Sequence, residues 1–255
     1  MVLTDDQKAL QETARRFSRE RLLPDYQKRE KLGVLDRALI TEMGSLGLLG
    51  VDLPEEVGGL GVDAVTTGLI AEELAYGDFN VSAVPVGISL IAAILMRHAR
   101  SEVVQEWVPR MTRGDAVVAI CLTEPRGGSD ASKLQLRARR DGEDWVLNGE
   151  KTSITFADRA DAYLVFARTG TPESGAKGVS AFFFPYEGTK GISRTCFDDL
   201  GSHIIGRGSV FLDDPMMREA QRKTLTTLLD HVSPAGQIPS NVRVDSGEPD
   251  YSGVG

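Results

Sequence analysis

The chain has 255 residues, 41% of them hydrophobic, which is enough to bury a core in one large or two ordinary domains. Its formal net charge of −8 and its isoelectric point near 5.0 argue against a nucleic acid or a membrane surface as the main ligand, because both favour a basic footprint. Two cysteines, three scattered histidines and an opening without a leader pattern predict no disulfide framework, no metal site and a cytoplasmic location.

Residues 1–114 have a helical pattern. Thr4 and Gln7 have the spacing of a capping box, which predicts that the first helix starts directly after Thr4. The apolar run over 81–96 is interrupted by polar residues and is too short to cross a bilayer, so a buried helix is expected there. The glycine-rich stretch 58–61 is predicted to be a loop. Further helices are predicted over 36–46, 63–76, 84–97 and from 101 to just before Gly114.

From residue 116 the pattern becomes alternating, with turn signals about every ten residues. Asp141-Gly142 and Asn148-Gly149 are both hairpin dipeptides, because glycine tolerates a positive φ. The pattern predicts an antiparallel β-sandwich or barrel, and hence an α+β multidomain chain with an all-α domain first. Strands are predicted over 117–123, 134–140, 145–147, 152–156, 162–168, 179–184, 192–197 and 209–212.

The expected domains are a helical domain over 1–114, a β domain over 115–214 and a divergent tail over 215–255. In the tail, 216–229 can form one helix, and the remainder has the composition of a disordered segment.

The segment 119–130 reads AICLTEPRGGSD and carries the first chemical signal. An apolar strand ends at Thr123, and Gly127-Gly128 lets backbone amides approach a ligand without a Cβ in the way. Such a turn can hold a pyrophosphate, while the Thr123 and Ser129 hydroxyls can reach polar groups of the same ligand. An ordinary strand and turn with a Ser/Asp cap explains the pattern equally well.

The second signal is the segment 145–155, which reads WVLNGEKTSIT. A hairpin at Asn148-Gly149 would deliver a strand on which Ser153 and Thr155 share one polar face. A solvated outer face is the alternative explanation.

Together the two segments resemble the acyl-CoA dehydrogenase family, whose middle domain carries a C-x-T-E-P-x-x-G-S-D strand and turn followed by a W-x-x-N-G-x-K-x-x-I-T segment. The resemblance runs from about Thr4 to Asp214. It implies an FAD-binding β domain, and a C-terminal helical bundle that should begin soon after Asp214 and is expected to be missing from this chain.

The resemblance also implies the site residues. Thr123 would hydrogen-bond the flavin ring, and Ser129 and Arg207 would contact the substrate. Ser153 stands where many members have a tryptophan, which suggests a differently shaped site for a branched or cyclic acyl group. The implied cofactor-binding residues are Cys121, Leu122, Thr123, Gly128, Ser129, Ser153, Ile154 and Thr155.

The implied reaction introduces an α,β double bond into an acyl-CoA thioester, by α-proton abstraction and β-hydride transfer to the flavin N5. The usual base is a glutamate of the C-terminal bundle. Asp78 is a second candidate, because relatives acting on cyclohexane- or cyclohexene-carboxyl-CoA use an aspartate in this region, although capping of the following helix explains Asp78 as well. The implied partners are acyl-CoA, an electron-transfer flavoprotein and further copies of the chain.

Two other functions stay open: a flavin monooxygenase of the same fold, and an inactive truncated remnant. NAD binding is not expected. Gly59-x-Gly61-x-x-Ala64 matches the dinucleotide fingerprint, but no apolar strand precedes it.

Overall fold

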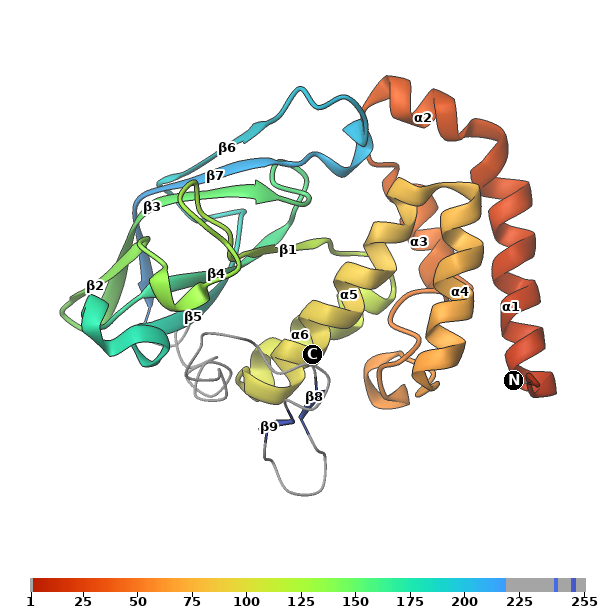
Figure 1. The fold of residues 1–255 in the computed structure, drawn as a ribbon, viewed down its shortest axis with the longest axis horizontal. Helices are drawn as coiled ribbons and strands as arrows, with labels where there is room; N and C mark the ends of the chain where they lie inside the picture. The colour runs from red at the N-terminus through yellow and green to blue at the C-terminus, as the bar shows by residue number, and fades with distance from the viewer. Residues whose placement is uncertain (1, 219–240, 243–248, 251–255) are drawn as a thin grey trace. The chain divides into compact units, whose positions relative to one another are not determined.

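The computed structural model describes residues 2–218, 241–242 and 249–250 (Figure 1). The chain divides into two compact parts, and each is described by itself. The helical part consists of Met1–Ala119, Thr155–Ala162 and Thr195–Gly208. The β part consists of Ile120–Ile154, Tyr163–Arg194 and, from Ser209 on, the remaining described residues.

The first helix, α1 (Asp5–Phe17), begins at the predicted capping box. The Thr4 hydroxyl accepts a hydrogen bond from the Gln7 amide at 3.2 Å, and the Gln7 side chain accepts one from the Thr4 amide at 3.1 Å. A π-helical turn (Ser18–Leu22) and a 3-10 turn follow, and then α2 (Tyr26–Leu32). The sequence analysis missed α2 because this helix has no buried residue and therefore no apolar period.

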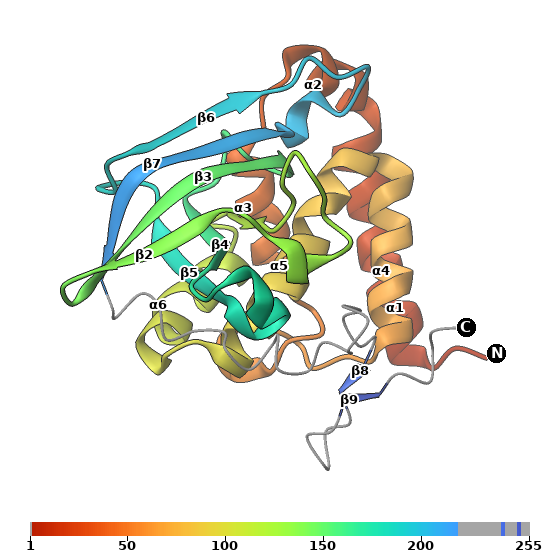
Figure 2. The same cartoon turned by 60° about the vertical axis from the view of Figure 1, so that its left-hand side comes forward.

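The other predicted helices are confirmed with small shifts at their ends. Each of α3, α4 and α5 starts at an aspartate whose carboxylate accepts hydrogen bonds from the first free amides, namely Asp36, Asp63 and Asp78. Figures 1 and 2 show α4 lying beside α1 on one side and α5 on the other. The helices are α3 (Arg37–Ser45), α4 (Ala64–Gly77), α5 (Phe79–His98) and α6 (Ser101–Thr112).

Helix α5 is longer than predicted, because it starts at the Asp78 cap and continues through Pro85. By length and composition alone its 20 residues could cross a membrane, so the expectation that this apolar run is too short was wrong. The core helix of a folded domain can have the same length and composition, so these two properties do not distinguish the two cases. Helix α5 packs against α4 and α6, and its inner face buries Val84, Ile88 and Leu95.

The glycine-rich loop after the 3-10 turn Glu55–Val57 owes its composition to close packing. A Cβ added to Gly59 would lie 1.9 Å from the Leu53 carbonyl oxygen. Gly59→Ala is therefore expected to lower the free energy of unfolding by about 1–3 kcal/mol in urea titrations. Gly68→Ala in α4 is the control: nothing lies within 4 Å of its added Cβ, so a gain of about 0.5–1 kcal/mol is expected. Equal effects of the two substitutions would contradict the packing argument.

The β domain is built on a seven-stranded sheet with the order β1-β4-β2-β3-β7-β6, and β5 pairs with β4. Figure 2 shows β2, β3, β7 and β6 running next to one another in this sheet. The strands are β1 (Val118–Cys121), β2 (Arg137–Asp141), β3 (Asp144–Ile154), β4 (Ala162–Arg168), β5 (Val179–Pro185), β6 (Ile192–Cys196) and β7 (Gly208–Arg218). A separate pair joins β8 (Asn241–Val242) to β9 (Pro249–Asp250).

The predicted order of a helical domain followed by a β domain is confirmed. The sheet is mixed and not purely antiparallel, because β2 pairs with β3 in antiparallel and with β4 in parallel. The alternating pattern could not reveal this, since a strand has the same period in either direction.

One of the two predicted hairpins forms and the other does not. Asp141-Gly142 turns β2 into β3, with Gly142 at φ +61°. Asn148-Gly149 instead lies inside β3, so the two strands predicted on either side of it are one. Gly149 has φ +141°, and a Cβ there would lie 3.2 Å from the Leu136 Cα. The glycine is needed because the neighbouring segment of the backbone comes close at this position, and not because the chain turns there.

The predicted helix over 216–229 is wrong at its start, because β7 continues to Arg218. The rest of that helix, 219–229, lies outside the described residues. The predicted disorder of the tail also falls mostly outside them.

Candidate functional site

The turn after β1 is held at both ends by the backbone. The Glu124 amide donates to the Gly127 carbonyl at 2.9 Å, and the Gly127 amide donates back at 3.0 Å. The Thr123 carbonyl accepts from the Thr152 amide of β3 at 2.9 Å. The two motifs of the sequence are therefore joined by a main-chain hydrogen bond beside the turn.

Gly128 lies directly against the Thr123 side chain. A Cβ at Gly128 would stand 3.1 Å from both the hydroxyl oxygen and the methyl carbon of Thr123. In the described part of the chain no hydrogen bond occupies the amides of Gly128 and Ser129, and Ser129 is exposed. Free amides beside a glycine that leaves room for a ligand suit a phosphate group, so these residues fit the pyrophosphate of FAD.

A buried ion pair stabilises the same turn. The Lys151 ammonium of β3 lies 2.8 Å from Glu124 Oε1 and donates to the Leu122 carbonyl at 3.0 Å. The Glu124 carboxylate also accepts the amides of Gln135 and Leu136 at 2.7 and 2.9 Å. Burial lowers the pKa of Lys151, and the Glu124 carboxylate opposes that shift.

The sequence analysis named Glu124 and Lys151 only as letters of their motifs and gave them no role. Lys151 is fully buried and cannot meet a ligand directly, whereas Glu124 is 7% exposed and lines a hollow of about 210 Å³ together with Arg126 and Gly149. The local sequence carries no signal for this pair, because Glu124 lies between Thr123 and Pro125 and Lys151 lies between Glu150 and Thr152, so neither charge interrupts an apolar run. Charged residues are buried only when they are paired, and the partner here is distant in the sequence.

Cys121 is the last residue of β1, and its side chain is fully buried. Burial raises the pKa of its thiol from 9.0 to about 12. Its part in ligand binding is therefore limited to the backbone. Leu122 is half-buried, and its carbonyl is already taken by Lys151.

Because Cys121 is fully buried and its thiol stays protonated, iodoacetamide at pH 8 is expected to label one cysteine of the folded chain, Cys196, whose pKa is also raised but whose side chain is exposed. In urea, two labels are expected. The contribution of Cys121 to stability is fully present below pH 9 and is lost as the pH rises toward about 12, because the unfolded thiol ionises first. Mass spectrometry of tryptic peptides measures the labelling, and equal labelling of Cys121 in the folded chain would contradict this account.

Polar and apolar side chains alternate where β3 ends. Ser153 and Thr155 are exposed on either side of Ile154, which is 2% exposed. Ile154 can therefore contact a ligand only through its backbone. Ser153 has φ +56°, a left-handed conformation that is uncommon for a residue with a side chain.

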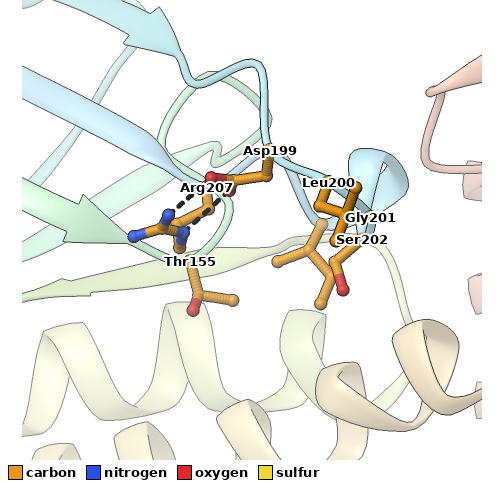
Figure 3. A pocket seen from close by; sticks show the side chains of 7 residues that line it. Thr155, Asp199, Leu200, Gly201, Ser202 and Arg207 are labelled. Atoms are coloured by element: carbon orange, nitrogen blue, oxygen red, sulfur yellow. Dashed lines mark hydrogen bonds and ion pairs between the residues drawn. The ribbon is translucent and has the colours of Figure 1, made fainter.

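A hollow of about 570 Å³ lies in the helical part beside Thr155 (Figure 3). Arg207 lines the hollow, and its guanidinium forms two hydrogen bonds with Asp199, at 2.8 and 2.5 Å. The hydrogen bonds from Arg207 lower the pKa of the Asp199 carboxyl. The lining residues are Thr155, Asp199, Leu200, Gly201, Ser202, Ile205 and Arg207.

Asp78 has structural partners for its carboxylate. One oxygen accepts the amides of Asn80 and Val81, which caps α5, and the other lies 2.9 Å from the Arg29 guanidinium. Its side chain is 3% exposed. This is the capping role that the sequence left open, and these contacts engage both oxygens of the carboxylate. A role as base stays a prediction.

The structure thus places the predicted site residues in two groups. Thr123, Gly128 and Ser129 lie together in the β part, whereas Thr155 and Arg207 lie together around the hollow of the helical part. Within the described ranges no group of three His, Cys, Asp or Glu side chains is arranged to hold a metal ion.

The chain thus combines a helical domain, a mixed β domain and a glycine turn that can hold a ligand. Two models of one protein family match these two domains. Residues 4–115 match the model described as acyl-CoA dehydrogenase, N-terminal domain, and residues 119–214 match the acyl-CoA dehydrogenase, middle domain. The chain belongs to the acyl-CoA dehydrogenase family.

Similar proteins extend the comparison. The chain is 34% identical over 214 residues to the mitochondrial short-chain specific acyl-CoA dehydrogenase of Rattus norvegicus, a match covering 83% of this chain and 52% of the relative. A glutaryl-CoA dehydrogenase from Mycobacterium smegmatis in complex with FADH2 aligns with a TM-score of 0.80 and 31% identity, over 88% of this chain and 56% of that one.

A chain of a structure described as an electron transferring flavoprotein of Acidaminococcus fermentans aligns with a TM-score of 0.81 and 31% identity, over 88% and 59% of the two chains. The chain spans about half the length of the curated relatives it matches.

Proposed function

We propose that the protein is an FAD-dependent oxidoreductase of the acyl-CoA dehydrogenase type, which introduces an α,β double bond into an acyl-CoA thioester. The observation that carries the proposal is the turn after β1, where free amides lie next to Gly128 and Thr123. The match to both family domains supports it.

In this proposal the residues that hold the cofactor belong to the β part, except Thr155, which belongs to the helical part. The Gly128 and Ser129 amides donate to the pyrophosphate, and the Thr123 hydroxyl donates to the flavin ring. The backbone of Cys121, Leu122 and Ile154 lines the ring, and the exposed Ser153 and Thr155 offer hydroxyls to it. Bound FAD supplies the two-electron acceptor for oxidation of the carbon–carbon bond.

The acyl-CoA substrate contacts Ser129 and Arg207. Ser153 leaves room for a branched or cyclic acyl group, as in dehydrogenases of cyclohexane- or cyclohexene-carboxyl-CoA. Asp78 is the proposed base of that branch. Undiminished turnover of a cyclic thioester by a full-length relative with Asp78→Asn would eliminate this role.

The proposal includes an electron-transfer flavoprotein as electron acceptor and assembly into a homo-oligomer. We also propose that the chain is divided into domains at 1–114 and 115–214, followed by a divergent tail at 215–255. The cytoplasmic location stays a prediction, and the rat relative named above is mitochondrial.

The test uses the purified chain and its visible spectrum. FAD is added, excess is removed by gel filtration, and butyryl-CoA is then titrated anaerobically. Retained yellow colour supports cofactor binding, and bleaching by butyryl-CoA supports the dehydrogenase reaction. Oxygen consumption by the reduced protein would favour the monooxygenase alternative. Retained FAD without any bleaching would favour an inactive remnant, and failure to retain FAD would count against the proposal.

A further inference from the structure

Five of the seven residues around the hollow come from one loop, 199–205, so the position of this loop determines the shape of the hollow. The loop closes on itself at its base. There the Phe197 amide donates to the Arg207 carbonyl at 2.8 Å, and Asp199 pairs with Arg207.

The second half of the loop is held by its neighbours in the helical part. The amides of Phe156 and Ala157 donate to the carbonyls of Ile205 and Gly206, each at 3.0 Å. The Arg159 guanidinium donates to the carbonyls of residues 203 and 204, at 2.7 and 2.9 Å. This half has several independent attachments.

The first half depends on Glu30 of α2. Glu30 Oε1 accepts the His203 amide at 3.1 Å and lies 2.8 Å from His203 Nδ1, and the nearby Ser202 amide helps to lower the pKa of this carboxyl. A Cβ added to Gly201 would come within 3.7 Å of the same oxygen. The other oxygen, Oε2, accepts the Asn80 side chain of α5 at 3.2 Å. Glu30 of α2 thus binds His203 of the loop through one carboxylate oxygen and Asn80 of α5 through the other.

Leu200 shows why this attachment matters. Its side chain is fully exposed at the rim of the hollow, so burial of its own side chain does not hold this end of the loop. Between Asp199 and the His203 amide, the hydrogen bond described for the loop is internal, from the Ile205 amide to the Ser202 carbonyl at 3.1 Å, so the attachment to another element is the one that Glu30 makes at His203.

We propose that Glu30 is a positioning residue for the substrate: its carboxylate holds 199–203 in the conformation that forms the hollow beside Thr155 and Arg207. The inference rests on the proposed function, in which Arg207 contacts acyl-CoA. Burial raises the pKa of Glu30, but hydrogen bonds from His203 and Ser202 outweigh it and leave the pKa lowered. The carboxylate is therefore ionised, and the attachment present, at neutral pH. It is lost only as the pH falls below the ordinary value of 4.5, through the lower pKa of the folded chain.

The experiment compares four forms of the full chain: unsubstituted, Glu30→Ala, Glu30→Gln and Asn80→Ala. Amide hydrogen exchange is followed over 199–206, and butyryl-CoA affinity is measured by calorimetry. Glu30→Ala is expected to speed exchange in 199–203 about tenfold and to weaken butyryl-CoA binding by a similar factor. Exchange in α3 should not change.

The other two variants make the test specific. Glu30→Gln keeps an acceptor for the His203 and Ser202 amides and should recover part of the affinity. Asn80→Ala removes the contact to α5 but leaves Oε1 with the loop, so it should leave 199–203 protected.

Unchanged exchange in Glu30→Ala, or faster exchange with unchanged affinity, would overturn the inference alone. Failure of the unsubstituted chain to bind butyryl-CoA would overturn the proposed function together with the inference.

Discussion

Glu124→Ala is expected to lower the free energy of unfolding by about 3–5 kcal/mol, the usual cost of leaving one charge of a buried pair without its partner. The substitution leaves the fully buried Lys151 ammonium without its carboxylate partner, and it removes the acceptor of the Gln135 and Leu136 amides. Lys151→Ala should cost a similar amount for the same reason. Urea unfolding followed by tryptophan fluorescence measures both.

A surface pair provides the control. Arg113 and Asp115 have nearly the same donor–acceptor distance, 2.9 Å against 2.8 Å, but both side chains are largely exposed. Asp115→Ala should therefore change the free energy of unfolding by less than about 1 kcal/mol. In the double variant Glu124→Leu with Lys151→Met, much of the lost stability should return, because no charge is then buried. A loss in the double variant as large as the sum of the two single losses would contradict the pair as the cause.

Gly128→Val is expected to weaken FAD binding by about tenfold or more, because the added side chain must enter the space beside Thr123 and screen the neighbouring amides. Thr123→Val keeps the shape of the side chain but removes the hydroxyl, and about a tenfold loss is expected from one missing hydrogen bond to the ligand. Quenching of FAD fluorescence on titration with each variant measures the dissociation constants.

Gly127 supplies the matched control, since nothing lies within 4 Å of a Cβ added there. Gly127→Ala should therefore bind FAD nearly as well as the unsubstituted chain. If Gly127→Ala and Gly128→Val weakened FAD equally, the binding surface would not be the Gly128–Ser129 side of the turn.

Much of the helical domain could be predicted because its signals are local. Thr4 with Gln7, and the aspartates at 36 and 63, are short-range caps, and each marks a helix start in the structure. Helix α2 was missed because its stability does not depend on an apolar face of its own. The start of α5 was misplaced because Asp78, its cap, lies well before Pro85 and outside the apolar run.

The β domain shows where local signals are insufficient. Asn148-Gly149 has the composition of a turn, but Gly149 is required because a Cβ there would lie 3.2 Å from the Cα of Leu136, in the segment that leads into β2. The identity of a dipeptide limits its possible φ values, but it carries no information about which other segment packs against it. The parallel pairing of β2 with β4 was invisible for the same reason.

For the candidate site, the sequence by itself determined which groups are available to a ligand: a strand, a glycine turn and hydroxyls in a fixed order. This order was enough to indicate the family. Only the tertiary structure decided that Lys151 reaches back to Glu124 and Leu122, that Asp78 is bound by Arg29, and that Glu30 holds the loop before Arg207. These contacts join residues 27 to 173 positions apart, and charge pairing over such separations leaves no periodic trace along the chain.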